Sequence, residues 1–405
     1  MAGAPILSSQ PAAEAGDALI VSGRHIKPLD GVRGAAILLV MIFHFSREGS
    51  LEFSHRSTSF IDHAYEGVAA IGWCGVDLFF VLSGFLITGI LWDAKEGTGY
   101  FRNFYARRVL RIFPLYYAFL IGLFIVLPLI PAIDWNAPLK DQIWFWFYLP
   151  NLEKILVSGY HENTFHFATT HLWSLAVEEQ FYFVWPAVVL TFSRRNLIRI
   201  CGLCIVTALL LRTGIRVAGI TPEAAYRLMP ARMDALAVGA LVALAARNRD
   251  DLAAALRWMR PVVAVAAVVL IALAIARTGL HPDDAWVETI GFTALAGLFG
   301  AAVLYAVTCA PGSKTSRALS HPALTWMGKY SYGIYIIHLP VVLLLAWGVD
   351  WEGGFSTFGG LQLPSVVLFS LVAGAVSMAF AWLSWNLFES RFLKLKDRFV
   401  YSAPR

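Results

Sequence analysis

A strongly apolar segment near the start of the chain carries two side chains that could do chemistry, Arg33 and His44. An ionisable group inside an apolar membrane span costs roughly 2.5–3.5 kcal/mol on insertion, so each one raises a functional question. On a helix, the interval between them spans about 16 Å and leaves the two side chains within roughly 20° of one face. One face therefore offers a cation near one end and a candidate general base near the other. Alternatively, Arg33 extends to the lipid headgroups and His44 is a hydrogen-bonded core histidine.

The next apolar segment, GVDLFFVLSGFLITGIL, contains the carboxylate of Asp77. If this segment forms a helix antiparallel to the first, Asp77 reaches a depth that could match His44. A carboxylate beside an imidazole fixes its tautomer and raises its basicity. We therefore expect Asp77 to orient His44 as a second catalytic residue, the alternative being a buried carboxylate that caps or bridges helices.

Four arginines follow within ten residues, at positions 102, 107, 108 and 111. Arg108 and Arg111 are three residues apart, so on a helix they share a face and can bind one phosphate together. A nucleotide-bearing donor such as a CoA thioester would use such a pair, and Arg33 could assist it. The alternative is anchoring at the membrane boundary, since arginines there also bind anionic lipid.

The segment HLWSLAVEEQFYFVWP combines aromatic and polar side chains that lipid would reject. Glu178 and Tyr182 are four residues apart and share a helical face. Aromatic rings beside carboxylates suit a sugar, which stacks on the ring while its hydroxyls are hydrogen-bonded. We expect this segment to bind an acceptor, with Glu178 and Tyr182 positioning it and His171 and Trp173 at the mouth of the site.

The composition of the 405-residue chain predicts the elements that position these side chains. It is 58% hydrophobic and only 15% charged, with a mean hydropathy of +0.64, which disfavours a large soluble domain, disorder or a disulfide framework. We expect an all-α polytopic membrane bundle, with a segment at 141–150 too short to span and suited to the interface. The ten expected spans lie near residues 31–47, 68–92, 112–133, 171–193, 197–213, 229–246, 259–277, 287–309, 330–348 and 362–388.

The positive charges are distributed unevenly over this map. With the N-terminus inside, 23 of the 32 Lys and Arg residues fall on the cytoplasmic side, which predicts that both termini are cytoplasmic. The net charge of +5 therefore reflects topology, and nucleic-acid binding is not expected. Residues 1–27 are expected to form a flexible tail, 28–392 the membrane domain and 393–405 a basic cytoplasmic tail.

Six strings in order resemble the integral-membrane acyltransferase 3 family, whose members O-acylate sugars and related acceptors. They are LDGVRGAAILLVMIFHF, GVDLFFVLSGFLIT, FYARRVLRIFPLYY, HLWSLAVEEQFYF, RMDALAVGAL and YSYGIYIIHLP. The resemblance implies that His44 is the catalytic histidine, with Arg33 as the basic residue before it and Arg108 and Arg111 as the Arg-x-x-Arg pair. It also implies a ten-helix core that takes an acyl group, commonly acetyl, from cytoplasmic acyl-CoA. The esterase domain that some members append is not expected, because the chain ends shortly after residue 392.

Residues and resemblance together predict a multi-pass enzyme of the bacterial cytoplasmic membrane. It would transfer an acyl group from acyl-CoA to a hydroxyl of a cell-surface glycan or lipid-linked saccharide. The alternatives are a small hydrophobic acceptor such as a macrolide, or a proton-coupled transporter, although we find no internal repeat of helices. Membrane lipids are expected partners, the oligomeric state is left open, and acyl-CoA is expected as co-substrate rather than as a permanently bound cofactor. No metal site is expected, because His161, His166 and His171 lie at a spacing of five without a plausible third partner geometry.

Overall fold

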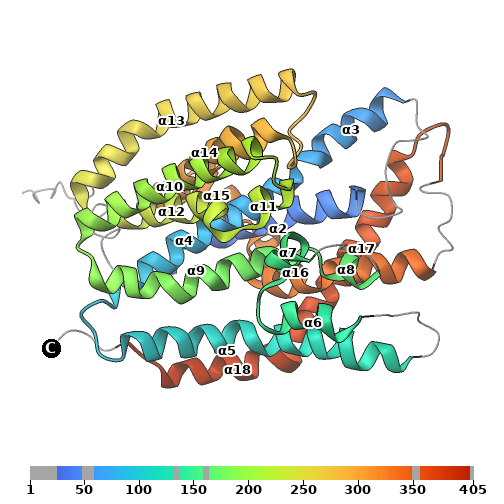
Figure 1. The fold of residues 1–405 in the computed structure, drawn as a ribbon, viewed down its shortest axis with the longest axis horizontal. Coiled ribbons are helices and arrows are strands. Elements are labelled where there is room, and N and C mark those ends of the chain that lie inside the picture. Colours follow the sequence, from blue (N-terminus) through green and yellow to red (C-terminus); the bar gives the residue numbers. More distant parts are fainter. Residues whose placement is uncertain (1–24, 48–58, 131–136, 158–163, 349–355, 402–405) are drawn as a thin grey trace, which may run out of the picture.

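A computed structural model of the chain describes residues 25–47, 59–130, 137–157, 164–348 and 356–401. These residues form helices and no β-strand, and the long helices run side by side in one bundle (Figure 1). The expected all-α fold is confirmed. Most of the expected N-terminal tail, the end of the C-terminal tail and His161 lie outside the described residues.

Ten long helices within the described residues match the ten expected spans. Nine helical runs there are long and apolar enough to cross a membrane, so the chain is a multi-pass membrane protein. The tenth, α9, runs alongside them, and Glu178, Glu179 and Gln180 lower its hydropathy (Figure 1). The long helices are α2 (Lys27–Arg47), α4 (Gly75–Asp93), α5 (Tyr100–Ile121), α9 (Leu172–Thr191), α10 (Arg194–Val217), α12 (Met229–Ala245), α13 (Arg249–Ala276), α14 (Phe292–Thr308), α16 (Pro322–Gly348) and α17 (Leu363–Ser384).

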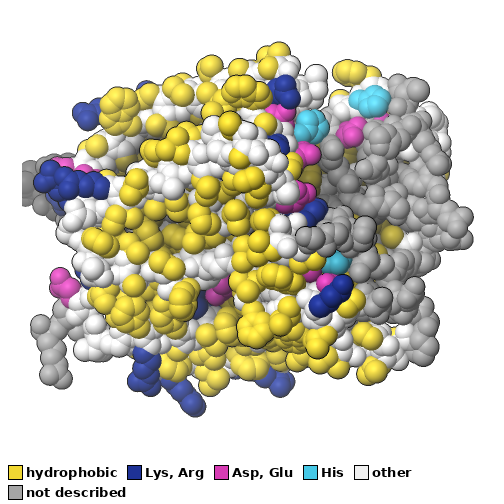
Figure 2. Space-filling model, viewed as in Figure 1, with side chains coloured by type: hydrophobic (Ala, Val, Ile, Leu, Met, Phe, Trp, Pro, Cys, Tyr) yellow, Lys and Arg dark blue, Asp and Glu magenta, His cyan; other side chains and the backbone are white. Residues whose placement is uncertain are grey.

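Several short helices gather toward one end of the bundle, at the right of Figure 1. Those at this end are α3 (Phe60–Ala70), α6 (Leu139–Trp146), α7 (Pro150–Leu156), α8 (Thr164–Thr169) and α11 (Pro222–Arg227). The expectation that residues 141–150 are too short to span is confirmed, since they fall in α6 and α7. We call this end the histidine end, and the opposite end, where residues 94–99 join α4 to α5, the arginine end. Figure 2 shows hydrophobic side chains over the middle of one face, with Lys and Arg mostly toward its edges.

Three helices begin well before the expected spans, among them α16, which begins at Pro322 rather than near 330. The arginine-rich segment expected to precede a span at 112–133 is itself helical, because α5 begins at Tyr100 and continues through Pro114. Helix α13 begins at Arg249 rather than near 259, and the Asn248 side chain caps it by accepting from the backbone N–H groups of Asp250 and Asp251. Apolar windows miss such polar first turns, so they place the start of the helix too late.

Close backbone contacts between two pairs of helices set the geometry of the site. A Cβ on Gly34 of α2 would overlap the Leu324 carbonyl oxygen of α16, and a Cβ on Gly84 of α4 would overlap the Leu236 carbonyl oxygen of α12. Small residues allow such approaches between membrane helices, where van der Waals packing replaces the hydrophobic effect. Helix α2 is therefore paired with α16, and α4 with α12.

Candidate active site

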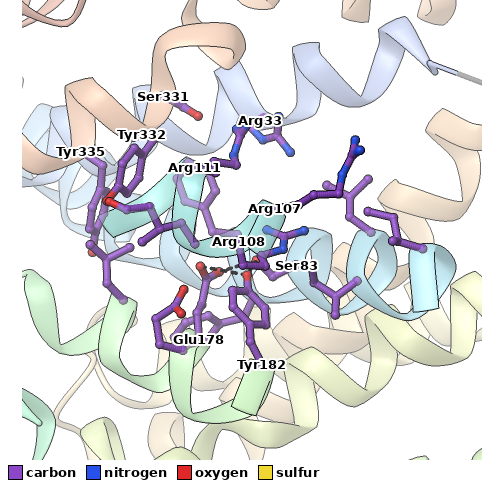
Figure 3. Close-up of a pocket in the computed structure, with 18 of the residues that line it drawn as sticks. Arg33, Ser83, Arg107, Arg108, Arg111, Glu178, Tyr182, Ser331, Tyr332 and Tyr335 are labelled. Atoms are coloured by element: carbon purple, nitrogen blue, oxygen red, sulfur yellow. Dashed lines mark hydrogen bonds between the residues drawn. The ribbon is translucent and has the colours of Figure 1, made fainter. Parts of the chain in front are cut away.

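A cavity of about 310 Å³ opens among α2, α4, α5, α9 and α16 (Figure 3). The three arginines expected to act together, Arg33, Arg108 and Arg111, all line it. So does a fourth arginine of α5, Arg107, and so does Lys396 near the end of the described chain. Helix α4 contributes an apolar wall that includes Phe79, Phe80 and Leu86. We call this space the arginine cavity.

Most of the basic groups around the arginine cavity lack an acidic partner. Within the described residues, Arg108, Arg111 and Lys396 form no ion pair, and Arg33 reaches Asp30 only at 3.9 Å. The Arg108 guanidinium instead lies 5.1 Å from the Tyr182 ring centroid. Like charges gathered in a low-dielectric site repel one another unless an anion lies between them. The cavity is therefore suited to bind an anion.

The opposite wall of the arginine cavity is acidic and hydroxylated. Ser83 of α4 donates a hydrogen bond to Glu178 of α9. The Tyr182 hydroxyl lies 2.8 Å from the Ser83 oxygen and 3.2 Å from Glu178 Oε2 (Figure 3). The stripe of Glu178 and Tyr182 thus forms as expected, but on the same cavity as the arginines. That these two residues bind the acceptor stays a prediction.

Tyr335 and Ser174 close the cavity on the side that leads to the histidine end. Their hydroxyl oxygens are 2.6 Å apart, and both lie within hydrogen-bond distance of the His171 carbonyl oxygen, at 2.9 Å and 3.2 Å. Both residues line the arginine cavity, whereas His171 and His44 do not. One layer of side chains therefore separates the cavity from the histidines beyond it.

Three buried histidines stand in a row behind this layer. The ring centroids of His171 and His338 are 4.9 Å apart, and those of His338 and His44 are also 4.9 Å apart. Neither ring nitrogen of His171 has a hydrogen-bond partner among the described residues. We call these three residues the histidine row. It joins α9, α16 and α2 at one depth in the bundle.

The hydrogen bonds of the row determine which nitrogen of His44 carries the proton. The His338 Nδ1 atom lies 2.6 Å from the Tyr335 carbonyl oxygen, which can only accept, so this nitrogen carries the hydrogen. In neutral His338, Nε2 is then an acceptor, and it lies 3.1 Å from His44 Nδ1. His44 Nδ1 is also 2.9 Å from the Val40 carbonyl oxygen. Two acceptors around Nδ1 place the hydrogen there and leave the lone pair on Nε2, the form a general base needs.

The expectation that Asp77 orients His44 was wrong. Asp77 Oδ1 instead accepts a hydrogen bond of 2.5 Å from Arg232 Nη2 on α12. Asp77 and Gly84 are seven residues apart on α4, so they lie on the same helical face. Because Gly84 packs against α12, this face points toward Arg232 and away from α2.

His338 and Arg232 are the residues whose roles sequence reasoning missed. Both are intramembrane ionisable residues in strings that the sequence analysis singled out, which was the available signal. The sequence does not show the pairing, because His338 lies 294 residues from His44 and Arg232 lies 155 residues from Asp77. Trp173, expected at the mouth of an acceptor site, is buried in a cluster of rings around the Arg232 guanidinium, 5.9 Å from it. Phe292 lies on this guanidinium at 3.9 Å.

A second polar network joins the short helices α7 and α8 to α9. The buried side chains Glu153 and His166 approach to 3.4 Å, and Gln180 of α9 donates to the Asn151 side chain at 2.9 Å. Burial raises the pKa of the Glu153 carboxyl, and the hydrogen bond from His166 opposes that rise. The network ties α8 to α7 and α7 to α9.

Replacing Asp77 by Asn is expected to destabilise the protein through Arg232, not to disturb His44. Removing one partner of a buried ion pair costs roughly 3–5 kcal/mol because the other charge stays uncompensated. A double variant, Asp77→Asn with Arg232→Met, should recover much of the lost thermal stability. The measurement is the melting temperature of the purified protein in detergent. If the double variant is no more stable than Asp77→Asn alone, the pair assigned here is incorrect.

Known proteins of one family resemble most of this chain. The acyltransferase 3 family model, described as an acyltransferase domain, matches residues 26–386. The peptidoglycan O-acetyltransferase OatA of Listeria monocytogenes is 30% identical over 339 residues, 80% of this chain and 50% of that protein. The putative peptidoglycan O-acetyltransferase YrhL of Bacillus subtilis is 29% identical over 334 residues, 79% of this chain and 49% of that protein. The chain thus spans about half the length of these relatives, and no solved structure matches it. The match over most of its length shows that the chain belongs to the acyltransferase 3 family of integral-membrane proteins.

Proposed function

We propose that this protein is a membrane O-acyltransferase that moves an acyl group, most simply acetyl, from acyl-CoA to a hydroxyl of a glycan. The observation that carries the proposal is the arrangement along one line of the bundle: unpaired cations around a cavity, then Tyr335, then the histidine row. The family membership and the O-acetyltransferase names of the relatives support it. In keeping with the predicted topology, the arginine end would face the cytoplasm of a bacterium.

The donor would enter at the arginine end with its phosphates on Arg108 and Arg111, assisted by Arg33. A cavity of about 310 Å³ lies at the small end of ligand pockets, so a CoA-sized donor would extend beyond it. The apolar wall of α4 suits the pantetheine arm, which could cover the distance of about 16 Å from Arg33 to His44 along α2. To reach His44, the thioester must pass Tyr335, whose movement would open the way.

His44 would act as the general base. Its Nε2 would take the proton of the acceptor hydroxyl while the hydroxyl oxygen attacks the thioester carbonyl carbon. The carbon–sulfur bond then breaks, and the proton on His44 passes to the departing thiolate, which releases CoA as its thiol. Acylation of His44 itself, followed by transfer to the acceptor, uses the same atom and stays open as the alternative route.

The acceptor would approach from the histidine end. The names of the relatives point to a cell-wall glycan, and we propose a glycan or lipid-linked saccharide for this chain. Glu178 and Tyr182 would offer hydrogen bonds to acceptor hydroxyls that extend past Tyr335 into the arginine cavity. His171 belongs to the row itself, whereas Trp173 is buried beside the Arg232 guanidinium. A small hydrophobic acceptor such as a macrolide is the other candidate from the sequence.

Replacing His44 by Ala should abolish acyl transfer while the protein stays folded in the membrane. General-base catalysis contributes roughly 10²–10⁴-fold, so any residual rate should be at or below the percent level. The assay is mass spectrometry of surface glycans and exported metabolites, with and without the gene and with each variant. The exposed His321 provides the control, and His321→Ala should keep the full product. Normal acylation by folded His44→Ala would refute the proposal.

Replacing His338 by Leu should lower kcat about tenfold or more, because the acceptor that holds the proton on His44 Nδ1 is lost. The Gln variant keeps an acceptor oxygen and should retain more activity. Because His338 does not line the arginine cavity, the KM for acyl-CoA should change little in either variant. Steady-state kinetics of the purified enzyme measures both quantities. A rise in KM with an unchanged kcat would show that His338 serves the donor site instead.

Replacing Arg108 and Arg111 together by Gln should weaken CoA binding at least tenfold, because charge-assisted hydrogen bonds to phosphate are lost. The exposed Arg195 of α10 provides a matched control, and Arg195→Gln should bind normally. Isothermal titration of CoA into the purified protein measures the effect. A transporter without a CoA site would show no binding before or after the change.

A further inference from the structure

The last described residues of the chain are attached to α5. The chain passes from α18 (Ser390–Lys394) into a single turn, η7 (Leu395–Arg398), and on to Tyr401. The Asn103 side chain donates a hydrogen bond of 2.9 Å to the Val400 carbonyl oxygen. The Arg107 guanidinium donates to the carbonyl oxygens of Phe399, at 3.0 Å, and Lys396, at 3.3 Å. Figure 1 shows α18 alongside α5 at the arginine end. We call residues 395–401 the C-terminal strap.

The strap contributes two side chains to the arginine cavity, Lys396 and Tyr401. Both lie beyond residue 386, where the match to the family model ends. The Arg107 guanidinium stands 5.9 Å from the Tyr401 ring, so the strap also positions one of the cavity's arginines. One boundary of this cavity is therefore built from sequence that the family model does not include.

A purely structural role of the strap does not explain why it places the charged side chain of Lys396 on the arginine cavity. Its ammonium group has no acidic partner among the described residues, and the nearby charges that act on it are those of Arg111, Arg108 and Arg107. Lys394 and Arg398, two positions to either side, are exposed and do not line the cavity. Those two suffice for anchoring at anionic lipid. Lys396 lines the cavity beside three arginines whose charges repel its own, and an anion bound among these cations would offset that repulsion.

We propose that the C-terminal strap is part of the donor site and that Lys396 binds a phosphate group of acyl-CoA. Tyr401 forms the adjoining wall, and Asn103 and Arg107 hold the strap in place. This inference rests on the proposed function, in which acyl-CoA is the donor. It adds a fifth cation to those of Arg33, Arg107, Arg108 and Arg111, contributed by a segment outside the region common to the family model.

The test is CoA binding by the purified full chain in phosphatidylcholine nanodiscs, followed by isothermal titration. Zwitterionic lipid keeps anionic headgroups from competing for the cations. Lys396→Gln should raise the Kd for CoA about tenfold, the size expected for one charge-assisted contact to phosphate. Lys396→Glu should raise it further, and Lys396→Arg should stay near the wild-type value. Lys394→Gln and Lys394→Glu are the matched controls and should leave the Kd unchanged.

The possible outcomes distinguish an error in the proposed donor from an error in the role proposed for the strap. If the wild-type protein does not bind CoA, the donor itself is wrong, and the inference is overturned with it. If the wild-type protein binds CoA but the Lys396 and Lys394 series give equal Kd values, the strap is not part of the donor site and the proposed function stands. Because Lys396 is only partly buried, the neutral variant should fold, and elution as a single peak in size-exclusion chromatography verifies this. A salt dependence of log Kd that is weaker in Lys396→Gln than in wild type supports the phosphate contact.

Discussion

Gly34 lets α2 approach the backbone of α16 so closely that a Cβ would overlap the Leu324 carbonyl oxygen. The two helices run in the same direction from this contact, and they bring His44 and His338 to one depth. Helix α16 also carries Tyr335, which faces the arginine cavity and contacts the carbonyl of His171. A single helix pair thus sets the tautomer of His44 and its distance from the cavity. A larger residue at position 34 would push α2 and α16 apart and so move His44 and His338 out of this arrangement.

Cations inside this bundle are paired with carboxylates in one region and lack such partners in another. Between α4, α10 and α12, the buried cations are paired, Arg232 with Asp77 at 2.5 Å and Arg212 with Asp234 at 2.8 Å. The partly buried Arg216 is likewise paired with the buried Glu288 at 2.7 Å. Around the arginine cavity, Arg108 and Arg111 have no such partner in the described part of the chain. Pairing is what makes a charge tolerable in a low-dielectric interior. The contrast between the two regions therefore distinguishes charges that are neutralised within the fold from charges that are left available to an anion.

Much of the fold could be read from the chain before the structure. Long apolar runs predict spans because only helices satisfy every backbone hydrogen bond in lipid, and the ten expected positions each hold a long helix. The clustering of Arg33, Arg108 and Arg111 was also predictable, since helical spacing and antiparallel order bring them to one end. The start of α5 was not, because its first turns are polar and escape an apolar window. The partner of Asp77 was not predictable either. The depth of a residue in the membrane does not say which neighbouring helix its side chain faces.

The sequence by itself determined that this is a polytopic helical membrane protein and which family it resembles. It also determined that Arg33 and His44 share one face of a helix and that Arg108 and Arg111 share a face of another. These follow from local composition and from spacing along single helices, where the geometry is fixed by 3.6 residues per turn. Only the tertiary structure decided that His338 and not Asp77 meets His44, that Glu178 shares the arginine cavity, and that Lys396 reaches it from the end of the chain. The first two depend on the rotation of one helix about its axis against another, and the third depends on the hydrogen bonds that attach the strap to α5. That rotation is set by close backbone contacts such as Gly84 on Leu236, between residues far apart in the sequence.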